Sequence, residues 1–267
     1  MDKENNKIEV SDLHKAFGRK RVLNGVDLKI KKGESLVVIG GSGTGKSVLI
    51  KCIQGLIRPD SGSIKIDGFE TVGAARKENE KHYAKMGMLF QGGALFDSLS
   101  VWENVAFGLL ENQKMPRRQA REKAVEVLRQ VGLGPDVADL SPSELSGGMR
   151  QRAALIRTLA MEPDLLLLDE PFSALDSLTR ISMQDWLIGQ VKGLDATVMM
   201  VTHDVEEAML VGNKIFLLSG RPVKQIKVID VSHITCREDL YTPSSVELKN
   251  ELVRAFLTEK AERGDNI

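Results

Sequence analysis

The chain has 267 residues, of which 42% are hydrophobic, so it can bury a sizeable core as one large domain or two small ones. Its 37 basic and 37 acidic residues balance, and the lack of a basic excess argues against a nucleic-acid-binding protein. Cys52 and Cys236 have no CxxC spacing, which favours reduced thiols over a disulfide or a zinc site. The charged start, MDKENNKIEV, does not fit a secretory signal, and no apolar run approaches the roughly 18 residues that span a bilayer. If the protein works at a membrane, we expect a partner to supply the crossing.

Two kinds of short extended segment are predicted along the chain. Residues 7–13 and 26–33 alternate apolar and polar side chains, which indicates an antiparallel sheet with one wet face. Residues 34–40, 164–170 and 197–203 contain continuous apolar runs instead. Such runs are typical of strands that are buried on both faces of a parallel sheet.

Helical segments are predicted between these strands. Residues 116–133 place their apolar side chains on one stripe, and residues 146–162 can begin at Ser146 as an N-cap. A last amphipathic helix is expected at residues 244–260. The fold class is therefore α/β, with a helical insert near residues 92–145.

Residues 40–47, GGSGTGKS, fit the pattern G-x-x-x-x-G-K-[ST] and lie between a predicted strand and a predicted helix, as a phosphate-binding loop requires. The glycines let the backbone N–H groups face the phosphates of a nucleotide, and the following helix directs its positive end at the same anion. Lys46 offers a positive charge to the phosphates, and Ser47 offers a hydroxyl to Mg²⁺. The predicted nucleotide-binding residues are Gly40, Gly41, Ser42, Gly43, Thr44, Gly45, Lys46 and Ser47.

Two further strand ends carry candidate catalytic groups. The apolar run LLLLDEP ends in Asp169 and Glu170, which places two carboxylates at the ligand-binding edge of an open α/β sheet. One acid can hold Mg²⁺ through water, and the other can deprotonate a water directed at the γ-phosphate. His203 follows the run TVMMVT and reaches the same edge, either as a structural hydrogen-bonding group or as a catalytic one.

The segment LSGGMRQR, residues 145–152, predicts a second anion-binding helix terminus, with a serine cap and two glycines. One nucleotide hardly needs two such termini from one chain. A second copy that presents Ser146, Gly147 and Gly148 to the γ-phosphate would account for this segment. The sequence thus predicts a head-to-tail dimer.

Over nearly its whole length the sequence resembles the ATP-binding-cassette (ABC) ATPases. The family's motifs occur in the family's order: GGSGTGKS as Walker A, Gln91 as the Q-loop glutamine, LSGGM as the signature, LLLLDE as Walker B, SALD with Asp176 as the D-loop, and His203 as the switch histidine. Met149 replaces the usual glutamine at the end of the signature, whereas its serine and glycines are retained.

The resemblance implies a fold and a mechanism. Two copies would enclose two ATP molecules, and Glu170 would act as the general base while His203 positions the γ-phosphate and the attacking water. Ser47, Gln91 and Asp169 would bind Mg²⁺ directly or through water. Phe17 matches the aromatic residue that stacks on adenine; the alternative is that it belongs to the core, as an aromatic residue near a strand end often does.

The implied fold is a P-loop NTPase core with a mainly parallel sheet, an N-terminal antiparallel β subdomain and a helical insert subdomain. The predicted divisions are residues 1–90 for the first part of the core with the β subdomain, 91–150 for the helical subdomain with Q-loop and signature, 151–230 for the second part of the core, and 231–267 for a C-terminal helical extension.

Two functions from different classes fit these motifs: the energy subunit of a membrane transporter, and a soluble cassette ATPase that acts on DNA or ribosomes. The single compact cassette, the short insert and the absence of a basic excess favour the transporter. A simple P-loop kinase does not account for LSGGM or His203. We therefore expect a second copy and a multi-span permease as partners, with an accessory substrate-binding or regulatory protein as a further candidate and no nucleic acid. The expected location is peripheral, on the cytoplasmic face of the inner (plasma) membrane.

The two halves of the sequence resemble different transporter subfamilies. Segments up to about residue 150, such as GMLFQGGALFDSLSVWENVAFGLL, resemble the ATPase of Mla-type phospholipid transporters, whereas later segments resemble the nitrate, sulfonate and taurine importers. The partner-docking surface is expected in the insert, so the first half favours phospholipid as the cargo. The apolar residues of that segment either form an exposed docking patch or pack the insert's own core: Leu95, Phe96, Leu99, Val101 and Trp102.

Overall fold

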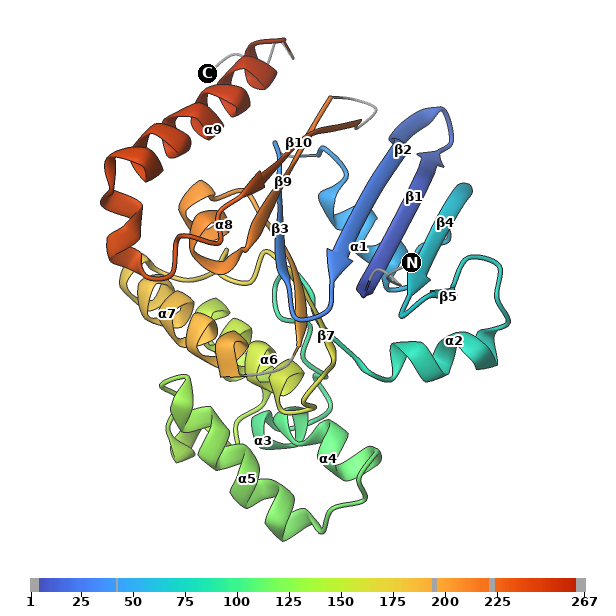
Figure 1. Cartoon of the computed structure of the whole chain (residues 1–267). Coiled ribbons are helices and arrows are strands. Elements are labelled where there is room, and N and C mark those ends of the chain that lie inside the picture. Colours follow the sequence, from blue (N-terminus) through green and yellow to red (C-terminus); the bar gives the residue numbers. More distant parts are fainter. Residues whose placement is uncertain (1–4, 42, 194–195, 221–223, 263–267) are drawn as a thin grey trace. The chain divides into compact units, whose positions relative to one another are not determined.

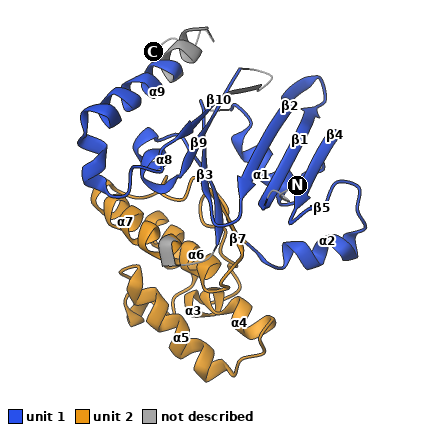
Figure 2. Cartoon of the chain, in the orientation of Figure 1, with its two compact units in different colours: residues 1–86, 195–267 blue, residues 87–194 orange. Residues whose placement is uncertain are grey.

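The structure is a computed structural model that describes residues 5–41, 43–193, 196–220 and 224–262 (Figure 1). The chain divides into two compact units (Figure 2). Unit 1 consists of residues 1–86 and 195–267, and unit 2 consists of residues 87–194.

Unit 1 begins with an antiparallel sheet in the order β2-β1-β4-β5. Its strands are β1 Asn6–Phe17, β2 Lys20–Lys31, β4 Ser61–Ile66 and β5 Phe69–Glu70. Residues of β1 face β2 in antiparallel register, for example Val10 opposite Leu28, and both side chains are buried. The antiparallel sheet predicted from residues 7–13 and 26–33 is confirmed, although both strands are longer than the alternating segments indicated.

The second sheet of unit 1 has the order β10-β9-β3-β8. Strand β3 pairs in parallel with both β8 and β9, and β10 pairs antiparallel with β9 at the edge. All residues of β3 and β8 are buried, including Ser35, Thr197 and Thr202 at the strand ends. Each strand contains a continuous apolar run, as expected for a doubly covered parallel strand. Their bounds, with those of their neighbours, are β3 Ser35–Ile39, β8 Thr197–Thr202, β9 Lys214–Ser219 and β10 Lys224–Asp230.

Helices connect and cover the strands of unit 1. Helix α1 contacts β8, and α9 packs on α8 and η3. Helix α8 contacts β3 (Figure 1). A salt bridge between Lys249 and Glu206 joins α9 to α8. The bounds are α1 Lys46–Ile53, α2 Arg76–Tyr83, α8 Val205–Val211, the 3-10 helix η3 Arg237–Tyr241 and α9 Pro243–Glu262.

Unit 2 contains strand β7, strand β6 apart from its first residue, and the helical insert. Helix α3 contacts both α5 and α6, and α5 also contacts α6. Helix α5 buries Ala120, Ala124 and Leu128, which lie on the apolar stripe predicted for residues 116–133. The bounds are β6 Met86–Leu89, α3 Val101–Val105, α4 Phe107–Glu111, α5 Arg117–Gln130, η1 Pro135–Val137, η2 Pro142–Glu144, α6 Gly147–Leu159, β7 Leu165–Asp169 and α7 Ser177–Gly193.

The α/β fold class is confirmed, with one antiparallel sheet and one mainly parallel sheet. Both cysteines are free thiols, as expected; Cys52 is buried and Cys236 is exposed. Burial raises the pKa of the Cys52 thiol to about 11, so this thiol stays protonated. Within the described part of the chain, no helix has the length and apolar character needed to cross a membrane.

Candidate functional site

The phosphate-binding loop of unit 1 connects β3 to α1 and is closed by its own side chains. Lys46 Nζ donates hydrogen bonds to Gly40 O at 2.7 Å and Gly41 O at 3.1 Å, and the lysine is buried. Thr44 Oγ1 also donates to Gly41 O, at 2.8 Å. These bonds hold the ammonium group at the loop, where an anion bound at the start of α1 would meet it. Ser42, also predicted to bind nucleotide, lies outside the described residues.

The first turn of α1 is suited to bind an anion. Its N-cap is Gly45, which has no side chain that could accept hydrogen bonds from the first-turn N–H groups. Helix α1 lies wholly within the described residues, and its first turn carries no acidic residue. Gly45 has φ 93°, and a Cβ added there would lie 2.7 Å from Val22 Cγ1, so the loop requires glycine at this position.

His203 lies at the same sheet edge as the phosphate-binding loop. Strands β3 and β8 are parallel, and Ile39 lies opposite Thr202, so the chain leaves the two strands side by side, at Gly40 and at His203. The following residue, Asp204, caps α8 by accepting hydrogen bonds from its first backbone N–H groups at 2.8 and 3.1 Å. Unit 1 therefore brings together the predicted Walker A motif and the predicted switch histidine.

Phe17 is the last residue of β1, beside the short turn to β2. Its side chain is 49% exposed, and Lys15 Nζ lies 5.4 Å from the centre of its ring. The alternative that Phe17 belongs to the core is therefore wrong. An exposed aromatic ring remains compatible with stacking on a flat base.

The Walker B strand and the Q-loop meet in unit 2. Asp169 is the buried last residue of β7, and Glu170 follows it directly. Gln91 Nε2 donates a hydrogen bond to Glu170 Oε2 at 3.1 Å, across 79 residues of sequence. Two residues that the sequence predicts for the hydrolytic site are thus in direct contact.

The backbone of Glu170 is held in an unusual conformation. Its φ is 52°, in the left-handed region that costs a residue with a side chain roughly 1–2 kcal/mol. Its carbonyl oxygen accepts hydrogen bonds from Gln151 Nε2 at 2.8 Å, Ser173 Oγ at 3.0 Å and Ser173 N at 3.3 Å. The surrounding residues therefore fix the orientation of this peptide group.

The sequence motifs did not assign a role to Gln151. Its side chain is 1% exposed, and its Oε1 also accepts a hydrogen bond from Ala174 N at 2.8 Å. The available signal was an amide side chain on the buried face of α6, next to Ala153, Ala154 and Leu155. Because a buried amide must find hydrogen-bond partners, such a residue indicates a structural hydrogen bond from α6 to another segment.

The signature and D-loop segments also lie in unit 2. Ser146 is the N-cap of α6 and accepts a hydrogen bond from Met149 N at 3.2 Å, as predicted. A Cβ added to the signature glycines would meet the SALD segment: at Gly147 it would lie 3.9 Å from Ala174 Cβ, and at Gly148 it would lie 3.3 Å from Leu175 Cδ2. The signature therefore packs against the D-loop of its own chain.

Asp176, the last residue of SALD, precedes α7. Its Oδ1 accepts a hydrogen bond from Thr179 N at 3.0 Å. Hydrogen bonds from the Thr179 side chain and backbone hold the pKa of the Asp176 carboxyl below its usual value. The D-loop aspartate is thus kept ionised at the start of this helix.

The residues present fit a nucleotide with Mg²⁺. Among the described residues, no group of three His, Cys, Asp or Glu side chains could hold a metal by itself. Mg²⁺ needs few protein ligands, because it keeps several waters and binds substrate phosphates. In unit 1, Ser47 has a hydroxyl oxygen, and in unit 2, Gln91 and Asp169 have amide and carboxylate oxygens; these are oxygen types that such an ion accepts. Within unit 1, the start of α1 has no side-chain cap and is suited to a phosphate.

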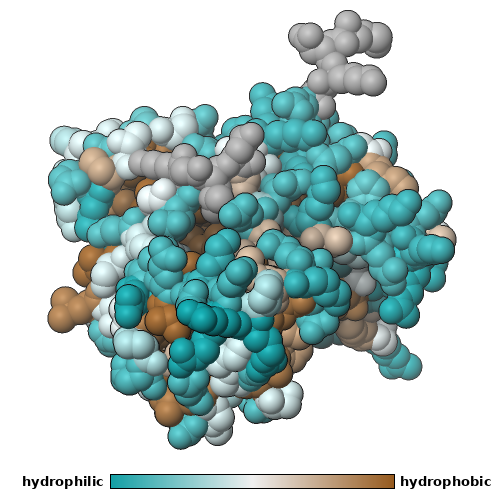
Figure 3. Space-filling view, turned by 90° about the horizontal axis from the view of Figure 1, so that it is seen from below, coloured by the Kyte–Doolittle hydropathy of each residue, from teal (hydrophilic) through white to brown (hydrophobic). Residues whose placement is uncertain are grey.

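The apolar segment after Gln91 is only partly exposed. Val101 and Trp102 are buried in the helical insert, so they are not part of an exposed patch. Phe96 is 46% exposed, and Phe107 is 38% exposed; their ring centres lie 4.8 Å apart. The face in Figure 3 is mostly hydrophilic, with apolar residues in separate spots. We call Phe96 and Phe107 the aromatic pair.

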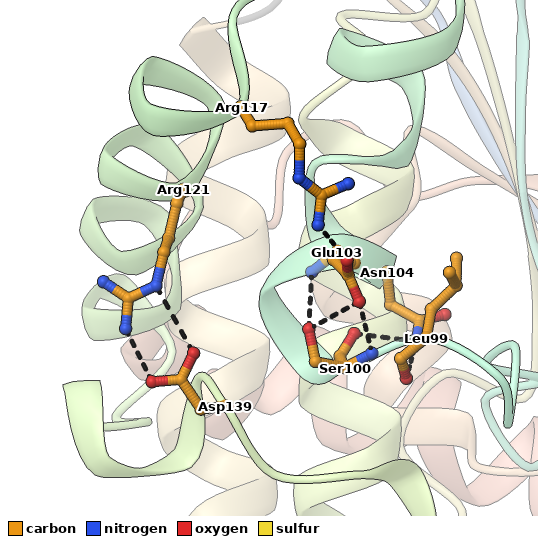
Figure 4. A network of polar contacts seen from close by, with 7 residues as sticks. All are labelled: Leu99, Ser100, Glu103, Asn104, Arg117, Arg121 and Asp139. Atoms are coloured by element: carbon orange, nitrogen blue, oxygen red, sulfur yellow. Dashed lines mark hydrogen bonds and ion pairs between the residues drawn. The ribbon is translucent and has the colours of Figure 1, made fainter.

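A buried asparagine fixes the loop that carries Phe96. Asn104 Oδ1 accepts a hydrogen bond from Phe96 N at 2.7 Å. Asn104 Nδ2 donates to the carbonyl oxygens of Phe96, Leu99 and Ser100 at 3.0–3.1 Å, the last two being drawn in Figure 4. The Asn104 side chain therefore holds this loop in one conformation.

Arginines on α5 stabilise the same insert by ion pairs. Arg117 pairs with Glu103, and Arg121 Nη2 lies 2.6 Å from Asp139 Oδ2 (Figure 4). Hydrogen bonds from the Ser100 backbone and from Arg117 lower the pKa of the Glu103 carboxyl.

Comparison with known proteins identifies the family. The ABC transporter family model matches residues 23–173. The sulfate/thiosulfate import ATP-binding protein CysA of Rhodopseudomonas palustris is 42% identical over 225 residues, covering 82% of this chain and 62% of that protein. The probable ribonucleotide transport ATP-binding protein mkl of Mycobacterium leprae is 42% identical over 211 residues, covering 79% of this chain and 60% of that protein. The chain thus spans about three fifths of the length of these curated relatives.

Solved structures agree with the sequence relatives. The dimeric post-hydrolysis structure of the ATP-binding cassette MJ0796, bound to ADP and Pi, has a TM-score of 0.77 and 31% sequence identity to this chain. The match covers 84% of this chain and 98% of the cassette. This chain belongs to the ABC transporter family, as one of its ATPase domains.

Proposed function

We propose that this protein is the ATP-hydrolysing energy subunit of an ABC transporter, which dimerises head-to-tail and drives a multi-span membrane permease. The observation that carries this proposal is the hydrogen bond between Gln91 and Glu170. It connects the candidate general base to the segment that leads into the aromatic pair. We therefore expect a movement of the aromatic pair to displace Gln91 and the Glu170 carboxylate, and the reverse.

The binding residues act on the phosphates and the base. Lys46 and the first turn of α1 bind the phosphates, and Phe17 stacks on adenine. Ser47, Gln91 and Asp169 hold Mg²⁺ directly or through water. When bound, this ion neutralises charge on the phosphates.

Hydrolysis requires a base and a group that positions the reactants. Glu170 accepts the proton of the attacking water, and its fixed backbone orients the carboxylate. His203 positions the γ-phosphate and the water from the adjacent strand end. Gln91 keeps the Glu170 carboxylate in place until the water is bound.

The dimer supplies the second anion-binding terminus. Ser146, Gly147 and Gly148 contact the nucleotide held by the partner copy, and Asp176 lies in the segment against which the signature packs. The dimeric state of the similar cassette MJ0796 supports this arrangement. In each cycle, closure with ATP and opening after hydrolysis would move the permease between two conformations.

The aromatic pair is the proposed contact with the permease. Exposed aromatic side chains next to a polar surface favour a protein partner, and Asn104 keeps Phe96 at that surface. The protein would then lie peripherally on the cytoplasmic face of the inner membrane. An accessory substrate-binding or regulatory protein is a further candidate partner.

We propose phospholipid as the cargo, because the insert that carries the docking surface resembles that of Mla-type transporters. The second candidate is import of a small anion. It is favoured by the resemblance of the second half and by the sulfate/thiosulfate import protein among the relatives. The partner permease decides between the two.

The hydrolytic role is tested by Glu170→Gln. Loss of the base should lower the rate of ATP hydrolysis about 10²- to 10⁴-fold, whereas ATP binding is retained. Steady-state phosphate release and equilibrium binding of a fluorescent ATP analogue measure the two effects. Gln190→Glu, a change of the same size elsewhere in the unit, is the control. An unchanged rate for Glu170→Gln would remove Glu170 from the role of base.

The cargo is tested by isolating the protein with its native membrane partner and by deleting its gene. For a lipid transporter, we expect co-purification with a lipid-transport permease and a loss of outer-membrane lipid asymmetry on deletion. Rescue of a sulfonate- or nitrate-uptake mutant, without any change in lipid asymmetry, would establish the anion importer instead.

A further inference from the structure

We infer that Gln151 is a positioning residue that couples the two ATP sites of the dimer. It links the signature, which contacts the partner's nucleotide, to Glu170, which hydrolyses the chain's own nucleotide. The inference rests on the proposed head-to-tail dimer and goes beyond it by naming the connecting side chain.

The position of Gln151 on α6 is the first argument. The helix begins at Gly147, directly after Ser146, so Gln151 lies about one turn into the helix that the signature starts. A helix moves as a rigid element over such a short distance. Any displacement of the signature terminus therefore reaches the Gln151 backbone.

The two hydrogen bonds of the Gln151 side chain are the second argument. Nε2 donates to Glu170 O and Oε1 accepts from Ala174 N, each at 2.8 Å. A single amide thus holds the residue that carries the base and the segment that forms the D-loop. At 1% exposure, water cannot replace either bond.

The strained backbone of Glu170 makes its orientation sensitive to loss of the Gln151 hydrogen bond. Its φ of 52° is unfavourable for a residue with a side chain, so the conformation persists only while its surroundings hold it. The carbonyl and the carboxylate belong to the same residue. A rotation of the backbone that follows loss of the Gln151 bond therefore also redirects the carboxylate from its place beside Gln91.

The functional consequence is that Glu170 is aligned for hydrolysis only when the N-terminus of α6 contacts the partner's nucleotide. When the partner's nucleotide draws the signature into place, Gln151 aligns Glu170 and Ala174 together. Hydrolysis in one site then depends on occupancy of the other, so ATP hydrolysis becomes cooperative in ATP concentration.

Gln151→Met tests the inference, because methionine keeps the side-chain volume and removes both hydrogen bonds. Gln151→Glu is the second variant: it keeps an acceptor for Ala174 N, but its carboxylate cannot donate to Glu170 O. The matched control is Gln184→Met on α7, which removes another buried amide of the same unit. All variants are made in the 267-residue chain.

Four quantities are measured for each variant: affinity for a fluorescent ATP analogue, ATP-driven dimerisation in the Glu170→Gln background, kcat with KM, and the Hill coefficient for ATP. For both Gln151 variants we expect binding and dimerisation within about twofold of the parent chain and an unchanged KM. We expect kcat to fall by about 10- to 100-fold and the Hill coefficient to fall toward 1. The Gln184 variant should keep the kcat and Hill coefficient of the wild-type chain.

Two outcomes would overturn the inference: wild-type kcat and cooperativity in either folded Gln151 variant, or a loss of kcat that accompanies loss of dimerisation. The second outcome would show that Gln151 only stabilises α6. Failure of the Glu170→Gln chain itself to dimerise with ATP would contradict the proposed dimer instead, so the two failures are distinguishable.

Discussion

Two helix termini of this protein are both suited to anions, yet they are built differently. Helix α1 begins after Gly45, which is in a left-handed conformation and has no side chain to cap the first turn. Helix α6 begins after Ser146, whose hydroxyl oxygen accepts a hydrogen bond from Met149 N. The first terminus therefore has no side-chain cap, whereas the second is capped by the Ser146 hydroxyl.

The start of α1 also carries more positive charge than the start of α6. Helix α1 carries Lys46 at its first position, with the ammonium group buried at the loop. The first cation of α6 is Arg150, in its fourth position. A phosphate at α1 therefore meets a full charge as well as backbone N–H groups, whereas α6 offers mainly its dipole. The comparison indicates that α1 provides affinity and that α6 acts on a nucleotide already bound.

Among the changes that distinguish the two termini, Lys46→Ala is expected to have the largest effect. Loss of a charged hydrogen-bond donor of about 1.5–3 kcal/mol should weaken binding of the ATP analogue about 10- to 100-fold. Ser146→Ala should leave the affinity of the isolated chain unchanged. Equilibrium titration with the fluorescent analogue compares the two. Equal losses of affinity in both variants would contradict the proposed difference between the two termini.

Glycine substitution should also separate the termini, by way of stability. Gly45→Ala places a Cβ 2.7 Å from Val22 Cγ1 at φ 93°, and this strain should lower the free energy of unfolding by about 1–3 kcal/mol. Gly148→Ala meets Leu175 Cδ2 at 3.3 Å, so its cost should be smaller. Chemical denaturation of both variants measures the difference. The opposite order would show that the α1 loop is the more adaptable one.

Removal of the cap from α6 should have a moderate effect. Ser146→Ala deletes the acceptor for Met149 N and should lower the free energy of unfolding by about 1 kcal/mol. Ser146→Asn retains a capping oxygen and should restore stability, but without the serine hydroxyl it should not restore ATP hydrolysis. Recovery of both properties with asparagine would reduce Ser146 to a structural cap.

The smallest effect should come from the turn before α6. Hydrogen bonds from the Ser141 backbone and hydroxyl lower the pKa of the Glu144 carboxyl in the folded chain. This contribution to stability is therefore fully present above the unfolded-state pKa of about 4.3, and it is lost as the pH falls through the lower folded-state value. Unfolding curves at pH 7 and at acidic pH should show a smaller pH dependence for Glu144→Gln than for the wild-type chain. An identical dependence would exclude this contribution.

Local patterns predicted the elements that build the site. Strands β3 and β8 could be recognised because strands that are buried on both faces contain an unbroken apolar run, and both sequences do. The start of α6 could be recognised because its cap is a contact between residues three apart. Chemistry that depends on neighbouring residues is thus readable from the sequence.

Contacts between distant segments were not readable in this way. The bond between Gln91 and Glu170 spans 79 residues, and a single sequence carries no signal for its geometry. Val101 and Trp102 were assigned to a possible exposed patch, but α3 is a short helix in contact with both α5 and α6, and little of its surface is left exposed. The packing of the insert, rather than its composition, decided which aromatic residues remained outside.

The left-handed backbone of Glu170 implies a trade-off between activity and robustness. Glycine adopts this φ without penalty, so Glu170→Gly relieves the strain. The greater freedom of glycine in the unfolded state opposes this gain, and we expect a net stability close to that of the wild-type chain. Such a chain lacks the carboxylate and would not hydrolyse ATP. The left-handed backbone at position 170 is therefore a cost in stability that accompanies the carboxylate proposed as the base.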